Sequence, residues 1–259
     1  MLTNIYHITY APSTKAASLF FWGCNLNCKG CYCQRRVFSS MLGDCVGYNL
    51  QQPKMAIPPT QFLTYDQVME ILSRVELEEV TFEGQEASTF PFYGHLSEEI
   101  SKRFASRNLL LTNGYELPDL RSTHKIGFGL KAVSDEIHRD YTGVSNARII
   151  ENLRKLYRSG KDLVIESVFI PGYIDLEETE RIAEFISGID KNLLYIILPY
   201  FQAGNNLWKR PTPDQMEQAT NIAKRHLNRV LAFTGEEQLK YEVVSLFPDP
   251  VINEYLEDG

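Results

Sequence analysis

Four of the five cysteines in this chain lie between positions 24 and 33, and three of them are spaced as ligands of a metal cluster. Cys24, Cys28 and Cys31 are four and three positions apart, so a tight loop can turn their three thiolates toward one point. A closed [4Fe–4S] site uses four protein ligands, one more than this set provides. The iron without a protein ligand can then bind a substrate or a second cofactor, as the open position of a catalytic zinc does.

The same cysteines also permit a different metal site. With Cys33 or Cys45 as a fourth thiolate, the loop would form a structural zinc knuckle. Outside such a site, Cys33 is interpreted as a spectator or a small buried apolar side chain. A functional alternative for Cys33 and Cys45 is a second metal site or a radical relay.

Alternating strand and helix patterns place the cysteine loop at the end of a strand. The apolar run 16–22 is predicted to be a β-strand that ends at Gly23, directly before the cysteines. Further strands are predicted at 80–82, 109–112, 126–130, 163–170 and 193–198. Helices are predicted at 64–75, 96–106, 147–159, 177–186 and 213–227, with start signals at Thr64 and Pro213.

Strands that alternate with helices indicate a parallel sheet with right-handed crossovers. About six such units are expected, fewer than the eight of a closed TIM barrel, so the α/β fold is predicted to be a partial (β/α)6 barrel or an open wound sheet. No change of composition divides residues 1–259, so we expect one domain with a core over about 16–208 and a C-terminal extension over about 209–259. The polar, turn-rich stretch 34–59 is interpreted as an insertion or a lid.

The composition excludes several classes of protein. The 259 residues carry 26 Lys and Arg against 33 Asp and Glu, a formal net charge of −7, which argues against nucleic-acid binding through bulk charge. No apolar run approaches the roughly 20 residues that span a bilayer. The N-terminus lacks the basic start and apolar run of a secretory signal. A cytoplasmic protein without membrane contact is therefore expected.

The C-x3-C-x2-C loop resembles the cluster motif of the radical S-adenosylmethionine (SAM) superfamily, and other stretches extend the resemblance. Gly84-Gln85-Glu86 follows a strand, in the place of the superfamily's Gly-Gly-Glu. Four further stretches resemble the branch that contains pyruvate formate-lyase activating enzyme: LLLTNGY at 109–115, LKAVSDEIHRDYTGVSN at 130–146, FIPG at 169–172 and LPYFQAGNNLW at 198–208. They occur in the family's order, and the similarity covers roughly 19–208.

This resemblance implies an oxygen-sensitive, anaerobic oxidoreductase with one [4Fe–4S] cluster on Cys24, Cys28 and Cys31 and one SAM. In the family, the reduced cluster cleaves SAM to a 5′-deoxyadenosyl radical, which abstracts hydrogen from a substrate. The carried-over SAM contacts are Glu86 for the ammonium, Gly84 and Gln85 for close backbone approach, Thr112 and Asn113, Lys131 for the carboxylate or a neighbouring acid, and Tyr32 for the adenine.

The resemblance also implies partners. A protein or peptide substrate is expected, together with a low-potential electron donor of the flavodoxin or ferredoxin type. A radical SAM enzyme that modifies a small molecule or RNA is the alternative, because the branch's D-G-P-G stretch is absent upstream of the cysteines. A non-catalytic zinc-binding protein is the alternative from another class.

Several positions depart from the activating-enzyme branch. Leu111 and Gly129 stand where the branch has acidic residues beside SAM, and Phe201 stands in place of a histidine. Glu166 lies near the position of an expected basic residue. Within the stretch SDEIH, His138 is interpreted first as a surface or cap residue of a helix.

Overall fold

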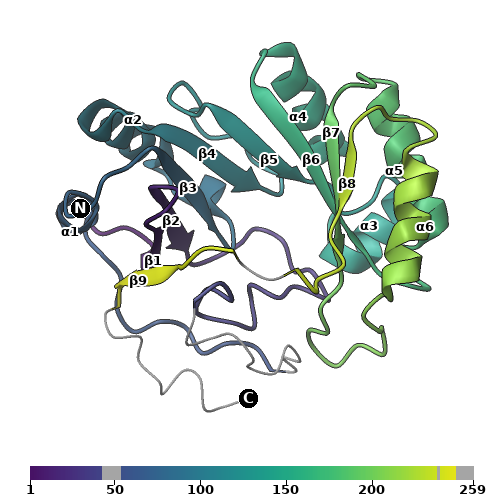
Figure 1. Ribbon diagram of the computed structural model, residues 1–259, viewed down its shortest axis with the longest axis horizontal. Coiled ribbons are helices and arrows are strands. Elements are labelled where there is room, and N and C mark those ends of the chain that lie inside the picture. Colours follow the sequence, from purple (N-terminus) through teal and green to yellow (C-terminus); the bar gives the residue numbers. More distant parts are fainter. Residues whose placement is uncertain (43–53, 238–239, 249–259) are drawn as a thin grey trace.

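The computed structural model describes residues 1–42, 54–237 and 240–248, which form one curved sheet with helices against it (Figure 1). Its strands are β1 (Ile5–Ala11), β2 (Ala16–Phe21), β3 (Glu79–Gly84), β4 (Arg107–Thr112), β5 (Lys125–Gly129), β6 (Asp162–Phe169), β7 (Leu194–Pro199), β8 (Val230–Ala232) and β9 (Val244–Phe247). The strand order is β8-β7-β6-β5-β4-β3-β2-β1-β9. Neighbours from β2 to β8 are parallel, whereas β1 is antiparallel to β2 and β9.

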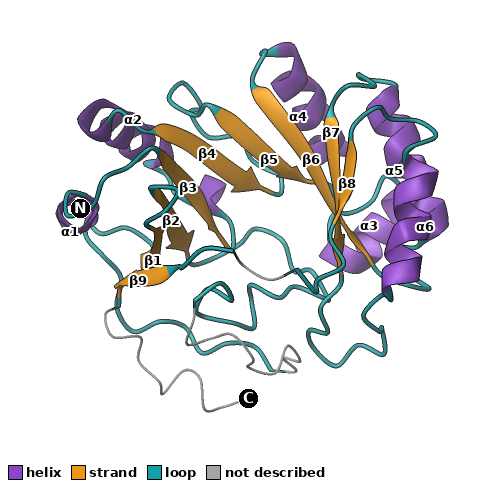
Figure 2. Cartoon of the chain, in the orientation of Figure 1, coloured by secondary structure: helices purple, strands orange, loops and turns teal. Residues whose placement is uncertain are grey.

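The convex face of this sheet is covered by α1 (Tyr65–Leu72), α2 (Tyr93–Phe104), α4 (Ala147–Arg158), α5 (Leu176–Ser187) and α6 (Pro213–Ala223). Helix α3 (Asp135–Thr142) packs with the cysteine loop instead, and a 3-10 turn, η2 (Ala87–Thr89), follows β3. Figure 2 shows α1, α2, α4, α5 and α6 outside the curve of the strands. Because β8 and β9 end the sheet without pairing to each other, the barrel is partial and open, as predicted.

Side chains alternate along each strand between a face that packs against the helices and a face that points toward the inside of the curve. On β2, Ala17, Leu19 and Phe21 are fully buried, and the residues between them are half-buried. The buried face of β1–β4 packs with α1 and α2, and that of β5–β7 packs with α4, α5 and α6. Full burial of one such Leu or Phe contributes about 1.5–3 kcal/mol. Burial of one face therefore fixes which side chains of each strand point toward the inside of the curve.

The sequence patterns missed three strands at the ends of the sheet. All seven residues of β1 are buried, but Tyr6, His7 and Tyr10 interrupt its apolar pattern. The short β8 adds a parallel strand beyond the six predicted. The predicted C-terminal extension contains β9, which pairs with β1 from the far end of the chain. These strands are set by pairing with distant segments rather than by their own patterns.

The predicted helices are present, with shifted ends. Helix α2 begins at Tyr93 rather than 96, because Tyr93 is buried against the ring of Phe82. Helix α6 ends at Ala223 rather than 227. The start signals at Thr64 and Pro213 are confirmed, and Thr64 and Thr212 each form a capping box.

Part of the predicted insertion at 34–59 falls outside the described residues. Residues 34–42 and 54–59 contain no helix or strand, and 43–53, including Cys45, are not described. None of the helices in the described part of the chain is both long and apolar enough to cross a bilayer.

Candidate functional site

A cavity of about 530 Å³ lies at the carboxyl ends of the parallel strands, a volume typical of cofactor sites. Its wall contains every residue that the sequence assigned to the site: Cys24, Cys28, Cys31, Tyr32, Gly84, Gln85, Glu86, Thr112, Asn113 and Lys131. These residues come from the loop after β2 and from the ends of β3, β4 and β5. In parallel α/β sheets this edge is where ligands bind. The structure thus brings the predicted residues together.

The cysteine loop is held by the end of α3. Asn27 N donates to Thr142 O at 3.1 Å, and Lys29 N donates to Tyr141 O at 2.9 Å. The last carbonyls of a helix have no intrahelical partner, so they are free to accept these bonds. The contact between the stretch 130–146 and the cysteine loop was not predicted. The family resemblance that singled out this stretch did not indicate which segment of the chain it contacts.

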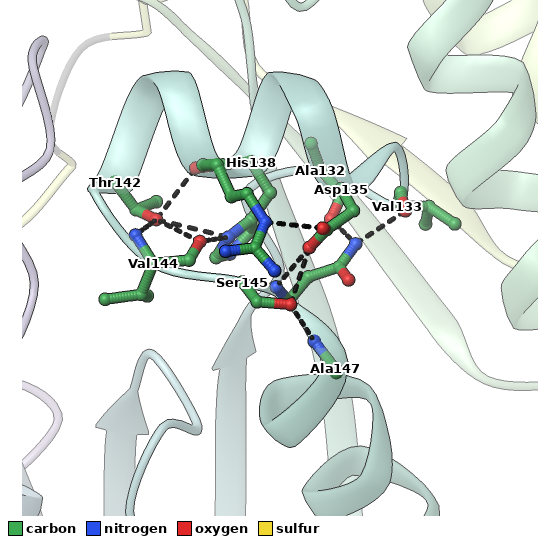
Figure 3. A network of polar contacts seen from close by, with 10 residues as sticks. Ala132, Val133, Asp135, His138, Thr142, Val144, Ser145 and Ala147 are labelled. Carbon is green, nitrogen blue, oxygen red and sulfur yellow. Dashed lines mark hydrogen bonds and ion pairs between the residues drawn. The ribbon is translucent and has the colours of Figure 1, made fainter.

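The segment between β5 and α4 is itself locked by a polar network (Figure 3). Asp135 Oδ1 accepts from Ser145 Oγ at 2.7 Å and from Asn146 N at 3.0 Å. His138 is fully buried, and its Nδ1 lies 2.8 Å from Val144 O. The interpretation of His138 as a surface residue was therefore wrong, because its ring fastens the turn after α3 instead of facing solvent.

The sulfur of Cys24 is approached by two donors. Leu26 N lies 3.4 Å from Cys24 Sγ, and Asn113 Nδ2 lies 3.6 Å from it. Asn113 Nδ2 also donates to Asn25 Oδ1 at 2.8 Å. Asn25 Nδ2 is buried and has no acceptor among the described residues. The Asn25 amide N–H therefore has no acceptor beside the cysteines. Such a free donor fits a [4Fe–4S] cluster, because cluster sulfurs accept hydrogen bonds.

The thiols are also suited to a cluster by their burial. Burial raises the pKa of Cys24 to about 11 and that of Cys28 to about 12. A buried thiol of this kind ionises readily only when a cation accompanies it, and binding of iron supplies that cation. The burial of Cys24 and Cys28 thus agrees with a role as cluster ligands, and the assignment of Cys24, Cys28 and Cys31 to the cluster stays a prediction.

The zinc knuckle considered as an alternative has Cys33 or Cys45 as its fourth thiolate, and Cys45 lies outside the described residues. Within residues 1–42, 54–237 and 240–248, no three Cys, His, Asp or Glu side chains are placed to share one metal ion. Cys33 hydrogen-bonds to Cys31, and this bond lowers the pKa of Cys31 to about 6.

Gly84 and Gln85 join the end of β3 to the cysteine loop. Gly84 has φ +105°, and a Cβ there would lie 2.6 Å from Phe21 N, so only glycine fits. Gln85 N donates to Phe21 O at 3.0 Å, and Gln85 Oε1 accepts from Gly23 N at 3.0 Å. The close approach predicted for Gly84 is therefore to β2, and the glutamine amide orients the start of the loop.

Glu86 is buried, with 2% of its surface exposed, and the chain already satisfies most of its carboxylate. It accepts from Thr112 Oγ1 at 2.7 Å, from Asn113 N at 2.7 Å and from Ser88 N at 3.2 Å. Burial raises the pKa of Glu86, and these hydrogen bonds oppose that rise. A carboxylate has about four acceptor positions, and the chain itself takes up at least three of them. Thr112 and Asn113 position Glu86 in addition to lining the cavity.

Lys131 and Tyr32 lie on other parts of the wall. A Cβ at Gly129 would lie 3.2 Å from Lys131 Nζ, so the ammonium reaches over the inner face of β5. Burial lowers the pKa of Lys131, but the nearby cysteines and Glu166 outweigh burial and raise it. Tyr32 accepts from Arg36 Nη1 at 2.5 Å, and its ring centroid is 6.1 Å from that of Phe201.

Two carboxylates in the cavity escaped the site prediction. Glu83 lies on β3 and Glu166 lies on β6, and both line the cavity. Burial raises the pKa of both groups. The sequence could have indicated them, because Glu83 directly follows Phe82 and Glu166 directly follows Ile165. Successive residues of a strand point to opposite faces, and since Phe82 and Ile165 are fully buried in the core, each carboxylate lies on the inner face of the sheet.

A family model described as the radical SAM superfamily matches residues 19–186. This chain belongs to the radical SAM superfamily. A Methanocaldococcus jannaschii protein, named as a proposed glycyl-radical enzyme activating enzyme, is 26% identical over 234 residues, 86% of this chain and 82% of that protein. Pyruvate formate-lyase 1-activating enzyme of Escherichia coli is 27% identical over 125 residues, 43% of this chain and 51% of that enzyme. The chain thus spans about half the length of the latter.

Solved structures support the fold. The crystal structure of Streptococcus suis SuiB superposes with a TM-score of 0.57 at 13% identity, covering 83% of this chain and 47% of that one. As a radical SAM enzyme, the protein uses a [4Fe–4S] cluster and SAM, which supply radical chemistry when bound. The cavity at the carboxyl ends of the parallel strands is lined by the residues that are predicted to bind and orient these groups.

Proposed function

We propose that this radical SAM enzyme abstracts hydrogen from a protein or peptide, as an activator of a partner enzyme. The observation that carries this proposal is the cavity that joins the three cysteines to Lys131 and Glu86 at the edge of an open sheet. An open sheet leaves the inside of the curve reachable by a segment of another chain. Relatives named as activating enzymes support the same class of substrate.

The residues have distinct roles in this proposal. Cys24, Cys28 and Cys31 hold the cluster, and Lys131 pairs with the SAM carboxylate. Glu86 binds the SAM ammonium. Tyr32 lies beside the adenine. The enzyme acts in the cytoplasm and receives its electron from a flavodoxin or ferredoxin.

The first test concerns the chemistry. After anaerobic reconstitution with iron and sulfide, the protein is incubated with SAM and dithionite, and 5′-deoxyadenosine is measured by mass spectrometry. We expect 5′-deoxyadenosine from the wild type and none from Cys28→Ala, which lacks one cluster ligand. An intact cluster that forms no 5′-deoxyadenosine would contradict the proposal.

The second test identifies the class of substrate. An extract from deuterated cells is divided into protein, small-molecule and RNA fractions, and each is supplied to the reconstituted enzyme. A hydrogen atom taken from a deuterated substrate carries deuterium into 5′-deoxyadenosine. We expect label from the protein fraction and its loss after protease digestion. Label from the small-molecule or RNA fraction instead would favour the alternative function.

A further inference from the structure

The cysteine loop has an outer surface as well as the inner surface that lines the cavity. The inner surface contributes five residues to the cavity wall: Cys24, Leu26, Cys28, Gly30 and Cys31. Asn27 and Lys29 lie between these residues along the chain, but they are exposed and are not part of the cavity wall. The outer surface around Lys29 is therefore next to the cysteines and can be reached without entering the cavity.

The loop between β7 and α6 lies against this outer surface. Asn206 Nδ2 donates a hydrogen bond to Lys29 O at 2.9 Å. A Cβ at Gly30 would lie 3.4 Å from Cζ3 of Trp208, so the indole packs over the backbone of the cysteine loop. Trp208 also stacks on Tyr173, with ring centroids 4.3 Å apart. Asn206 and Trp208 thus hold their loop in place beside the cysteines.

Leu207 lies between these two anchoring residues and points into solvent, with 96% of its surface exposed. Among the described residues, the next most exposed large apolar side chain is Leu2, at 65%. One exposed leucine is common on protein surfaces, so its surroundings decide whether a partner covers it. Contact with a partner would remove this apolar surface from water, which is favourable.

The surroundings of Leu207 are basic. Residues 24–36 contain three basic and no acidic residues, and residues 200–212 contain two basic and no acidic residues, in a chain with a net charge of −7. Lys29, Lys209 and Arg210 are exposed. Asp140 of α3 pairs with Lys29 Nζ at 2.6 Å and offsets one of these charges. The surface keeps a net positive charge on a protein that is negative as a whole, so it suits an acidic partner.

The position of this surface distinguishes between the two partners of the proposed function. The protein substrate must enter the cavity, because hydrogen is abstracted there. The electron donor only has to come close to the cluster, since electron transfer through protein slows steeply with distance. Lys29, Leu207 and Lys209 are not among the cavity-lining residues. A protein bound to them would lie beside the cluster ligands and leave the cavity free for SAM and substrate.

This inference rests on the proposed function and deepens it. We infer that Lys29, Leu207 and Lys209 form the docking surface for an acidic, low-potential redox protein that reduces the cluster. Leu207 is buried in the contact, and the two lysines attract carboxylates of the donor. One electron leaves the redox centre of the donor, which is oxidised, and enters the cluster, which is reduced.

The test measures how fast a protein donor reduces the reconstituted, SAM-bound enzyme. Reduced flavodoxin or reduced ferredoxin, both acidic proteins, is mixed anaerobically with the enzyme, and the loss of cluster absorbance is recorded at several donor concentrations. Leu207→Ala is expected to raise the half-saturating donor concentration about tenfold, because it removes most of the buried apolar surface. Lys209→Glu is expected to lower the second-order rate constant about tenfold at low salt, with a smaller difference at high salt.

Matched controls change residues of the same types elsewhere on the surface. Leu2→Ala and Lys224→Glu, at an exposed position after α6, are expected to keep the wild-type values. Wild-type concentration dependence in Leu207→Ala would overturn the inference. So would a wild-type cluster that deazaflavin reduces after illumination and that neither acidic protein reduces.

Illuminated deazaflavin, a small reductant, separates docking from the chemistry of the cluster. Every variant is expected to be reduced by it at the wild-type rate, because a small molecule needs no docking surface. An enzyme that forms no 5′-deoxyadenosine with deazaflavin would contradict the proposed function, whereas docking is judged from the rate of cluster reduction alone.

Two other occupants of this surface are outcomes of the same experiments. With deazaflavin as the reductant, loss of deuterium transfer from the protein fraction in Leu207→Ala would assign the surface to the substrate. A wild-type dimer that Leu207→Asp separates, seen by sedimentation velocity, would assign it to a second copy of this chain. Either result would overturn the assignment to an electron donor.

Discussion

Cys31 and Cys33 have neighbouring sulfurs but different positions relative to the cluster motif. Cys31 belongs to the C-x3-C-x2-C set, whereas Cys33 is exposed and donates a hydrogen bond to it. We predict that Cys31→Ala loses the cluster, because only two ligands remain, and that Cys33→Ala keeps about four irons per chain. Iron and sulfide analysis with visible absorption after reconstitution checks this. Loss of iron in Cys33→Ala would show that Cys33 is a ligand.

Asn113 is predicted to influence the reduction potential of the cluster. Its amide lies 3.6 Å from the Cys24 sulfur, and hydrogen bonds to cluster sulfurs stabilise the more negative, reduced state. Asn113→Ala is therefore expected to lower the midpoint potential, measured by a redox titration followed by EPR. Its backbone bond to Glu86 is retained.

The control for this prediction is Asn206→Ala. Asn206 donates to backbone carbonyls of the loops around Lys29 and Ala203 and to no cysteine sulfur in the described residues. Its midpoint potential should equal that of the wild type. A potential unchanged in Asn113→Ala would mean that this amide does not tune the cluster.

At the scale of elements, the turn between α3 and α4 is predicted to lose stability in acid. Hydrogen bonds from Ser145 and Arg139 lower the pKa of Asp135 from 3.8 to about 2. A carboxyl group with a lowered folded-state pKa stabilises the fold above its unfolded pKa, and this contribution is lost as the pH falls from 3.8 toward 2. Asp135→Asn should therefore have a lower Tm than the wild type at pH 7.

The pH dependence supplies the check on Asp135. The difference in Tm between wild type and Asp135→Asn should shrink as the pH is lowered below 3.8, because the wild-type carboxylate becomes protonated. Glu217→Gln, an exposed position on α6, serves as the control and should show no such convergence. A difference that stays constant across this range would assign the effect to packing rather than charge.

At the scale of the whole molecule, the cavity joins both halves of the core. Its walls come from the loop after β2, from β3 and β4, which pack in one cluster, and from β5–β7, which pack in the other. SAM at about 100 times its Kd should therefore stabilise the cluster-loaded protein by about 2.7 kcal/mol. At about 2–4 °C per kcal/mol, this is a rise in Tm of several degrees, measurable by anaerobic calorimetry.

Protein without iron is the control for this shift. Its response to SAM should be much smaller, because the open iron of the cluster contributes to SAM binding. An equal shift with and without iron would place SAM outside the cluster site.

The amino-acid sequence by itself determined those parts of the site whose residues are close together along the chain. The spacing of Cys24, Cys28 and Cys31, and the apolar run that ends before them, are properties of adjacent residues. Because parallel strands share one carboxyl edge, Glu86, Thr112 and Lys131 could also be assigned to that edge before the fold was known.

Only the tertiary structure decided how the separate parts of the site contact one another. Three features depend on strand order and register: Asn113 approaches Cys24, the end of α3 holds the cysteine loop, and Glu83 and Glu166 line one cavity. The pairing of β9 with β1 joins segments more than 200 positions apart. Such contacts arise from burial of whole faces, and no pattern along a single segment specifies which distant face will cover it.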